Sequence, residues 1–387
     1  MKKFLSLTLV IVCLTLCNLV CAQNIQLGSD RLDQLLPLLK DKKVALIVNQ
    51  TSCLSNGTHL LDTLLFHDTN IIKIFAPEHG FRGNADAGEK IIDGKDTKTG
   101  IPVISLYGKN YKPSPEQLSD IDIVIFDIQD VGTRFYTYIS TMHYALEACA
   151  ENGKDFLVLD RPNPNDYVDG PILDPKYKSF VGMHPIPTLH GLTIGELANM
   201  INGEGWLKNK AKCNLTVIPM AGWQHKQPYI LPIKPSPNLP NGNAIKLYPS
   251  LCFFEATNVS VGRGTESPFE VVGAPSSKYG KFTFTPRSTE GAKNPLNKDK
   301  VCYGIDLRTN NFEGGLSLQY LIAFYQKSGL GAAFFTNPKF MDLLAGTNQL
   351  RLQIIEGKTE EQIRSGWQLG LKEYKTMRTK YLLYNEN

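Results

Sequence analysis

Short apolar runs alternate with amphipathic segments along the first 165 residues of the chain. The amphipathic segments include a leucine face over 60–65 and a capping-box pattern formed by Ser114 and Gln117. A helix is predicted over 139–151, closed by the Asn-Gly pair that follows it. Strands are predicted at the apolar runs 44–48, 71–75, 103–106, 121–126 and 156–159. Strands this continuously apolar that alternate with helices are typical of a mainly parallel sheet covered on both faces, so we predict an α/β fold.

The middle and the end of the chain have a different pattern. Proline and glycine become frequent after residue 160, and the predicted elements become short. The pattern predicts a helix over 191–200 with Thr193 as its N-cap, then an irregular loop or crossover from Pro232 to Pro249. Beyond that loop the sequence is mixed α+β, which places a domain boundary near residue 248. Further helices are predicted at 317–325 and 359–374, the second with a capping box.

The first 22 residues have the composition of an export signal. Two lysines precede an almost unbroken apolar run over 4–16, and Val20-Cys21-Ala22 offers a cleavage site. The apolar run is short for a membrane span. A lipid anchor at Cys21 is disfavoured because Val20 is bulky where such sites have small residues. We therefore predict a signal peptide over 1–22 and an exported, periplasmic protein with no integral membrane span.

Composition and charge exclude several classes of protein. The 387 residues are 42% hydrophobic and 20% charged, which excludes a disordered chain, a collagen-like repeat and a small disulfide scaffold. The formal net charge of +4 includes Lys2 and Lys3, and no dense Lys/Arg stripe occurs, so no nucleic-acid partner is expected. The cysteines after the signal segment are odd in number and well separated, which predicts buried free thiols. They are Cys53, Cys149, Cys213, Cys252 and Cys302.

Motifs for several common chemistries are absent from the sequence. The first predicted strand is not followed by G-x-G-x-x-G, and no G-x-x-x-x-G-K-[ST] occurs, so a dinucleotide or P-loop nucleotide enzyme is disfavoured. G-x-S-x-G is missing, which argues against a serine-hydrolase elbow. The histidines lack H-E-x-x-H and similar ligand spacings. We expect neither a metal nor a cofactor.

Polar residues follow each predicted strand of the first half. Because ligands of open parallel sheets bind beyond the carboxyl ends of the strands, these residues are expected to converge on one rim. Each of them alone is more easily explained as a turn or cap residue, and only their convergence predicts a binding site. They are 49–51, Glu78-His79-Gly80, Tyr107, Asp127 with Asp130, and Asp160-Arg161 with Asn163.

Carboxylates are the best candidates for chemistry at this rim. Glu78 follows Pro77, whose fixed φ stiffens the chain, so Glu78 could serve as a general acid held beside an apolar strand end. A surface pair with Arg82 explains Glu78 equally well. Asp127 or Asp130 could supply the second carboxylate that cleavage of a glycosidic bond normally uses, although capping of the loop is the alternative for both.

Aromatic and basic residues suggest a sugar that carries an acid group. Tyr136 and Tyr138 alternate, so they could share one face of an extended segment and pack on a pyranose ring, with core packing as the alternative. Arg134, Arg161 and Arg263 could bind a substrate carboxylate through paired hydrogen bonds. A dense polar stretch in the second half, at Glu255, Asn258 and Gly262-Arg263-Gly264, is either a tight turn or the opposite wall of an interdomain cleft.

At these motifs the sequence resembles the NamZ family of peptidoglycan exo-β-N-acetylmuramidases, formerly a domain of unknown function, DUF1343. The resemblance spans nearly all of the predicted mature chain, from Val44 to Tyr384. The motifs that carry it, in order, are A-P-E-H-G-F-R-G at 76–83, D-I-Q-D-V-G-T-R-F-Y-T-Y at 127–138, L-D-R-P-N-P at 159–164, H-G-L-T-I-G-E at 190–196, S-P-N-L-P at 236–240, the stretch 248–273, and R-T-K-Y-L-L-Y at 378–384.

The resemblance implies an architecture and an activity. The architecture is a Rossmann-like N-terminal domain, here 23–247, followed by a smaller α+β C-terminal domain, 248–387, that closes a cleft. The activity is hydrolysis that releases non-reducing-end N-acetylmuramic acid from peptidoglycan fragments such as MurNAc-GlcNAc or muropeptides. Glu78, in the P-E-H-G motif, is the implied catalytic residue.

Other roles follow as hypotheses. Arg134 or Arg263 is expected to hold the lactyl carboxylate, and either a second carboxylate or the substrate's own acetamido oxygen completes the reaction. The residues expected to assist Glu78 are His79, Asp127 and Asp130. The residues expected to contact the sugar are Tyr136, Tyr138, Asp160, Arg161, Asn163, Asn238, Glu255 and Asn258. Two alternatives stay open: a non-catalytic periplasmic muropeptide-binding protein, and an esterase or amidase that acts on cell-wall material.

Overall fold

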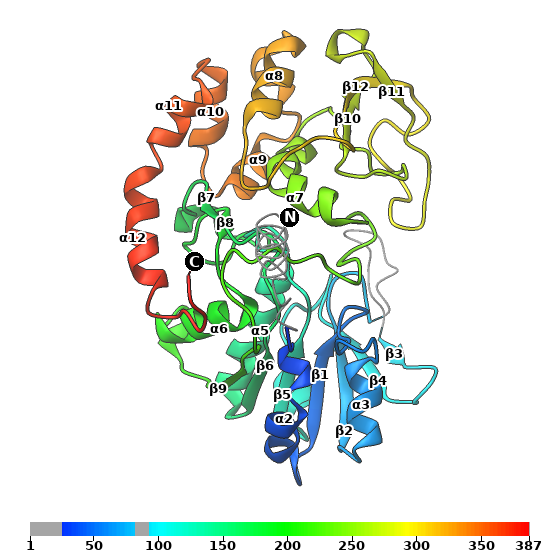
Figure 1. Cartoon of the computed structure of the whole chain (residues 1–387), viewed down its shortest axis with the longest axis vertical. Coiled ribbons are helices and arrows are strands. Elements are labelled where there is room, and N and C mark those ends of the chain that lie inside the picture. The colour runs from blue at the N-terminus through cyan, green and yellow to red at the C-terminus, as the bar shows by residue number, and fades with distance from the viewer. Residues whose placement is uncertain (1–24, 82–92, 387) are drawn as a thin grey trace, which may run out of the picture.

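The central feature of the structure is a seven-stranded sheet in the lower half of the molecule (Figure 1). The computed structural model describes residues 25–81 and 93–386, so the predicted signal peptide lies outside the described residues. The strands are β1 (Val44–Val48), β2 (Ile71–Ala76), β3 (Gly94–Lys95), β4 (Pro102–Ser105), β5 (Ile123–Asp127), β6 (Asp155–Leu159) and β9 (Asn214–Ile218). Their order is β3-β4-β2-β1-β5-β6-β9, and each is parallel to its neighbours except the edge strand β3.

Helices cover both faces of this sheet because side chains alternate along each strand. Every second residue of β1, starting with Val44, packs in one core with the first two helices of the chain. The intervening residues, Ala45 and Ile47, belong to the core on the other face. The helices are α2 (Leu32–Leu39) and α3 (Leu60–Phe66) on the first face, and α4 (Pro115–Leu118), α5 (Tyr138–Asn152) and α6 (Ile194–Gly203) on the second. The predicted Rossmann-like, mainly parallel α/β architecture is confirmed.

The sequence signals for several element ends are confirmed. The five predicted strands coincide with β1, β2, β4, β5 and β6 to within about two residues at each end. Gly153 closes α5 in the left-handed conformation, with φ 61°. Thr193 accepts a hydrogen bond from the backbone N–H of Glu196 in the capping box of α6, and Thr359 does the same with Gln362 at α11 (Glu360–Ser365).

The prediction of an irregular loop up to Pro249 is wrong over its second half. Helix α7 spans Gly242–Leu251, with the Asn241 side chain accepting from the backbone N–H of Ala244 at its start. A proline inside a helix frees the carbonyl four residues earlier, here that of Ile245. The side-chain amide of Asn165 donates to this carbonyl at 3.0 Å, so a distant residue supplies the hydrogen bond that Pro249 cannot make.

The predicted single helix over 359–374 is two helices. Helix α11 ends at Ser365, and α12 begins at Gln368 and runs to Arg378. Gly366 and Trp367 lie between them, and glycine is a weak helix former. The apolar spacing of this region continues across the break, which is why the sequence pattern alone did not reveal it.

The upper half of the molecule is mixed α+β, as predicted (Figure 1). A three-stranded antiparallel sheet has the order β10-β12-β11, and a short antiparallel pair, β7-β8, comes from the first half of the sequence. The strands are β7 (Val168–Asp169), β8 (Leu189–His190), β10 (Val271–Ala274), β11 (Phe282–Phe284) and β12 (Cys302–Asp306). The helices are α7, α8 (Gln319–Ser328), α9 (Pro338–Ala345), α10 (Gln349–Ile355), α11 and α12. Short 3-10 helices are η1 (Gly28–Asp30), η2 (Pro175–Tyr177), η3 (Lys208–Lys210), η4 (Cys252–Ala256), η5 (Ser277–Tyr279) and η6 (Gly331–Phe334).

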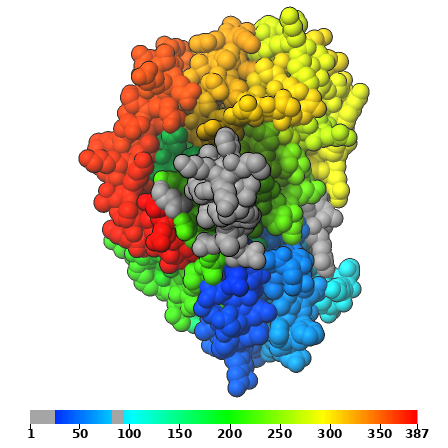
Figure 2. All heavy atoms as spheres, viewed as in Figure 1, coloured from blue at the N-terminus to red at the C-terminus, as the bar shows by residue number. Residues whose placement is uncertain are grey.

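The two halves share one hydrophobic core. Buried residues of a single cluster extend from Ala45 in β1 through Tyr248 in α7 to Tyr374 in α12. After α12 the chain runs back toward the lower half, where the red C-terminal segment lies against the green part of the first half of the sequence (Figure 2). Among the described residues, no helix has both the length and the apolar character needed to cross a membrane. The five cysteines of the described residues are free thiols, four of them buried and Cys53 half-buried.

Candidate active site

A cavity of about 270 Å³ lies between the sheet and the second half of the chain. The first half contributes the loop after β2, the loop after β4 and the start of α5, whereas the second half contributes η4, the 262–269 turn and α9. A segment of the crossover, 236–239, forms a further side. The lining residues are Glu78, His79, Tyr107, Phe135, Tyr136, Thr137, Tyr138, Phe180, Val181, Ser236, Asn238, Leu239, Tyr248, Cys252, Glu255, Arg263, Phe269, Phe340 and Leu344.

Glu78 reaches this cavity from a tight turn at the end of β2. The turn is closed by a hydrogen bond of 3.0 Å from the backbone N–H of Gly80 to the carbonyl of Pro77. His79 occupies the position of the turn that has a positive φ, 67°, where glycine is usually found. Non-glycine residues with strained backbone angles cluster at functional sites, so the conformation of this turn supports a functional role for Glu78 and His79.

Two hydroxyl groups contact the Glu78 carboxylate. Thr137 Oγ1 donates to Glu78 Oε2 at 2.5 Å, and the Tyr107 hydroxyl is also hydrogen-bonded to Glu78. Burial, together with the neighbouring charge of Glu78, raises the pKa of Tyr107 well above its usual range. Tyr107 therefore stays protonated and available as a donor. Thr137 and Tyr107 both belong to the first half of the chain, which also carries Glu78, so these contacts lie on one side of the cavity.

Tyr136 and Tyr138 line the cavity, but not as parts of an extended segment. Thr137 has helical backbone angles and Tyr138 begins α5, so the predicted extended conformation is wrong. Their rings are perpendicular to one another, with centroids 4.9 Å apart. Both hydroxyls donate to the carbonyl of Pro235, at 2.9 and 3.3 Å. The tyrosines therefore offer ring surface to the cavity while their hydroxyls hold the adjacent crossover segment.

The crossover segment places Asn238 in the cavity lining. The Gln50 side chain adds a third donor to the Pro235 carbonyl, at 3.2 Å. Asn238 itself donates through Nδ2 to the carbonyl of Gly291 at 2.6 Å, which ties the segment to the second half of the chain. The crossover segment is therefore held by the first half at Pro235 and by the second half at Asn238.

Arg263 and Glu255 form the charged part of the opposite wall. Arg263 Nε donates to Glu255 Oε1 at 2.6 Å, and the guanidinium lies over the ring of Phe269 at 5.2 Å from its centroid. Among the described residues, Arg263 Nη1 and Nη2 have no hydrogen-bond partner. Gly262 and Gly264 both have φ 80°, and a Cβ at Gly264 would lie 2.3 Å from a backbone oxygen. The glycines thus permit the turn that aims Arg263 at the cavity.

Comparisons with known proteins agree with this geometry. The model of "Exo-beta-N-acetylmuramidase NamZ, N-terminal" matches residues 44–243, and that of the corresponding C-terminal domain matches 246–384. This chain belongs to the NamZ family. The resemblance noted in the sequence is therefore confirmed.

Individual relatives of this NamZ-family chain cover most of its length. The chain is 40% identical to "Peptidoglycan beta-N-acetylmuramidase NamZ" of Bacillus subtilis (strain 168), over 91% of this chain and 90% of the relative. Two crystal structures of DUF1343 family proteins from Bacteroides fragilis NCTC 9343 superpose with TM-scores of 0.87 and 0.82, at 47% and 30% identity. Each covers 94% of this chain and 100% of its own.

Asp127 and Arg161 pair with one another in this NamZ-family chain. Arg161 donates from Nε and Nη2 to the two oxygens of Asp127, at 2.6 and 2.8 Å, and both side chains are buried. Arg161 also donates to the carbonyl of Cys53 at 3.0 Å. Within the part of the chain that the structure describes, neither residue lines the cavity. The pair fixes the ends of β5 and β6 beneath the rim.

Asp130 caps its own loop. Its Oδ2 accepts from the backbone N–H of Gly132 at 2.7 Å, and burial raises its pKa to about 7. His190 Nε2 lies 3.9 Å from the same oxygen. Asp130 Oδ1 and His190 Nε2 have no hydrogen-bond partner among the described residues. Asp130 lies outside the cavity lining as the described residues define it.

Arg134 is surrounded by backbone carbonyls. Nη1 and Nη2 donate to four of them, at 2.7 to 3.1 Å, and the side chain is fully buried. Two carbonyls belong to the first half and two to the end of α9, so Arg134 joins the halves. The acceptors are Pro171, Ile186, Leu344 and Ala345. Of the two arginines predicted to bind the lactyl carboxylate, the structure brings Arg263 to the cavity and holds Arg134 away from it.

Asp160, Asn163 and the backbone of Asn258 make hydrogen bonds elsewhere, and among the described residues Asn258 Oδ1 has no hydrogen-bond partner. Asp160 accepts from the Thr193 hydroxyl and from the backbone N–H of Gly195, each at 2.8 Å. Asn163 donates to the carbonyl of Leu192 at 3.0 Å, and the Asn258 carbonyl accepts from Asn297. In the described chain, Asp160, Asn163 and Asn258 do not line the cavity, whereas Glu255 and Asn238 do.

Sequence reasoning missed several lining residues. Thr137 lies inside a quoted motif but was given no role, although its position between two predicted sugar contacts was a usable signal. Tyr107 was noted only as a residue that follows a strand. Phe180 and Phe340 come from separate loops and helices, and nothing in their sequence neighbourhoods predicts that they meet at the cavity.

Proposed function

We propose that this chain is an exo-acting glycosidase that releases N-acetylmuramic acid from the non-reducing ends of peptidoglycan fragments during cell-wall turnover. The observation that carries the proposal is the Glu78 carboxylate in a cavity built by both halves of a NamZ-family chain. Hydrolysis of a glycosidic bond normally depends on carboxylate side chains, so Glu78 is the catalytic residue of the proposal. The relative of 40% identity, named as a peptidoglycan β-N-acetylmuramidase, supports the same reaction.

The size of the cavity supports action on a terminal sugar. Its volume of about 270 Å³ is near the lower limit of small-molecule pockets, roughly 300 Å³. A space of this size suits one sugar ring with its substituents rather than a length of glycan strand. Aromatic rings at Tyr136 and Tyr138 provide surface for the C–H face of that ring.

Arg263 is the proposed partner of the lactyl carboxylate, which distinguishes muramic acid from glucosamine. Its Nη1 and Nη2 are a geometric match for two carboxylate oxygens. Glu255 keeps Arg263 oriented through Nε. Because Asp127 is paired with Arg161, the groups that can complement Glu78 are, among the described lining residues, Glu255 and His79, and beyond them the substrate's own acetamido oxygen.

Export to the periplasm is part of the proposal. Peptidoglycan lies outside the cytoplasmic membrane, and residues 1–22 have the charge and apolar pattern of a cleavable signal. We expect the chain isolated from its native cells to begin at Gln23, as N-terminal sequencing would determine. A chain that begins at a lipid-modified Cys21 would instead support membrane anchoring.

Product analysis tests the proposed activity. The purified chain is incubated with MurNAc-GlcNAc, and the products are separated and identified by mass spectrometry. A glycosidase of the proposed type yields free N-acetylmuramic acid and N-acetylglucosamine. A binding protein would leave the disaccharide intact, and an esterase or amidase would release acetate without splitting it, so either result would overturn the proposal.

A further inference from the structure

Thr137 occupies the N-cap position of α5 without capping it. A threonine at this position usually accepts a hydrogen bond from a backbone N–H of the first turn. Thr193 and Thr359 do so at α6 and α11, with extended backbone angles of φ −71° and ψ 168° or 161°. Thr137 has φ −75° and ψ −7°, and among the described residues its side chain accepts no such hydrogen bond. The backbone angles of Thr137 are helical, whereas those of Thr193 and Thr359, which do cap their helices, are extended.

The Thr137 hydroxyl contacts Glu78 instead. It donates to Glu78 Oε2 at 2.5 Å, across 59 positions of the sequence. Side-chain capping normally stabilises a helix, so a threonine at the N-cap that does not cap indicates another use for its hydroxyl. The N-terminus of this 15-residue helix also favours a negative charge beside it.

Tyr107 contacts the same carboxylate from a different element. The Tyr107 ring packs edge-on against the ring of Tyr111 and at a tilt against the ring of Phe180. In both pairs the ring centroids are 5.8 Å apart. The Tyr107 hydroxyl is hydrogen-bonded to Glu78 and stays protonated, as described above. Glu78 therefore receives hydroxyl groups from the loop after β4 and from the start of α5.

We propose that Thr137 and Tyr107 are positioning residues that hold the carboxylate group of Glu78 in place at the cavity. This inference rests on the proposed function. Among the described residues, the other titratable and charged groups that line the cavity with Glu78 are His79, Tyr136, Tyr138, Tyr248, Cys252, Glu255 and Arg263.

The chain offers a matched control for the test. Thr359 is an exposed N-cap threonine that makes the usual cap and lies away from the cavity lining. Thr137→Val, Thr137→Ser and Tyr107→Phe are compared with Thr359→Val for kcat, KM and Tm on a chromogenic N-acetylmuramic acid glycoside. Thr137→Val is expected to lower kcat by about 10- to 100-fold, with little change in KM or Tm. Thr137→Ser should restore most of kcat, and Thr359→Val should lower Tm while leaving kcat unchanged.

The split between kcat and KM separates positioning from a merely structural effect. A misplaced carboxylate slows the chemical step, so Thr137→Val and Tyr107→Phe are expected to lower kcat while KM and Tm stay near the parental values. A loss of kcat that is always accompanied by a matching loss of Tm would overturn the inference. Tyr107→Phe carries the same test if Thr137→Val fails to fold.

Failure of the inference is distinguishable from failure of the proposed function. A parent protein that cleaves the glycoside, together with Thr137→Val and Tyr107→Phe at the parental kcat, would overturn the positioning role alone. Equal impairment of Thr137→Ser and Thr137→Val would do the same. A parent protein that leaves both the glycoside and MurNAc-GlcNAc intact would overturn the proposed function, and the inference with it.

Discussion

The hydroxyl of Tyr384 donates to Asp160 Oδ2 at 2.5 Å, although the two residues are 224 positions apart in the chain. Asp160 follows β6 and is fully buried, whereas Tyr384 belongs to the C-terminal tail. Burial, and then the nearby charge of Glu196, raise the pKa of Asp160 to about 7. The tail therefore completes the polar contacts at the end of a central strand, and we expect it to be required for stability.

Replacement of Tyr384 by phenylalanine tests this role of the tail. Tyr384→Phe removes one donor from a buried carboxyl group and is expected to lower the free energy of unfolding by about 1–3 kcal/mol. Tyr381→Phe is the matched control, because the Tyr381 hydroxyl bonds to the partly exposed Glu204 and its loss should cost less. Urea denaturation measures both changes. Equal destabilisation by the two variants would contradict the assignment.

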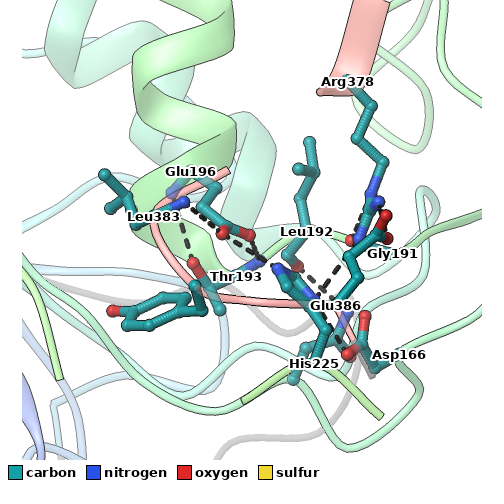
Figure 3. Close-up of polar contacts among 12 residues, drawn as sticks. Asp166, Gly191, Leu192, Thr193, Glu196, His225, Arg378, Leu383 and Glu386 are labelled. Carbon is teal, nitrogen blue, oxygen red and sulfur yellow. Dashed lines mark hydrogen bonds and ion pairs between the residues drawn. The ribbon is translucent and has the colours of Figure 1, made fainter. Parts of the chain in front are cut away.

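His225 predicts a pH dependence of stability. It lies between Asp166 and Glu196, at 2.9 and 3.0 Å, within the polar cluster that also includes Arg378 and Glu386 (Figure 3). Burial alone would lower the pKa of His225, but the hydrogen bonds to the two carboxylates outweigh it and raise the pKa to about 9. The folded-state pKa is thus above the unfolded value of about 6.5.

The sign of the effect follows from this order of pKa values. Protonated His225 stabilises the fold fully below pH ~6.5, and the contribution, on the order of 3 kcal/mol at most, is lost as pH rises through about 9. Denaturation between pH 6 and 10 should show this loss in the parent and not in His225→Gln. His184→Gln is the control, because burial lowers the pKa of His184 well below its usual range and the slope should persist. A parental slope in His225→Gln would refute the prediction.

Substitution of the two candidate arginines should change different properties, KM for Arg263 and Tm for Arg134. Arg263→Gln is expected to raise KM for an N-acetylmuramic acid glycoside by about 10- to 100-fold, because a charged pair of hydrogen bonds to the lactyl group is lost. Arg134→Met leaves four buried carbonyls without donors, so it should lower Tm by several degrees. Steady-state kinetics and thermal denaturation of both variants decide the matter. An unchanged KM in Arg263→Gln would remove Arg263 from substrate recognition.

The strained turn at His79 allows its ring to be tested separately from its backbone. Glycine accepts the positive φ of this position without strain, so His79→Gly should keep a Tm near that of the parent. His79→Ala keeps the strain and should have the lower Tm. If the ring assists Glu78, both variants lose kcat/KM to a similar extent, by about 100-fold. Parental kcat/KM in His79→Gly would show that the ring takes no part.

The parts of the fold that were predictable have local causes. Every residue of β1 and β5 is buried, and the apolar runs of the sequence predicted both strands. The capping box that begins at Thr193 predicted the start of α6. Strand β9 was missed because most of its residues are only partly buried or exposed at the sheet edge, which breaks up the apolar run. Helix α7 was missed because Pro249 argues against a helix, and its cost is offset by Asn165, which donates to the carbonyl of Ile245 from 80 positions away.

The site was predictable where it depends on motifs and unpredictable where it depends on packing. Glu78 and Arg263 could be singled out because each lies in a turn with distinctive neighbours. The sequence alone does not distinguish the role of Arg134 from that of Arg263. Arg134 is structural because it donates to carbonyls at the end of α9, more than 200 positions away, whereas Arg263 faces the cavity. The role of Thr137 depends on its backbone angles, which its motif does not reveal.

The most direct test of the account compares the parent with Glu78→Gln, which keeps the side-chain shape and removes the carboxylate. Cleavage of a chromogenic N-acetylmuramic acid glycoside is followed together with calorimetric binding of MurNAc-GlcNAc. The account predicts a fall in kcat of about 1,000-fold or more, with binding retained. Cleavage by Glu78→Gln at the parental rate would contradict it.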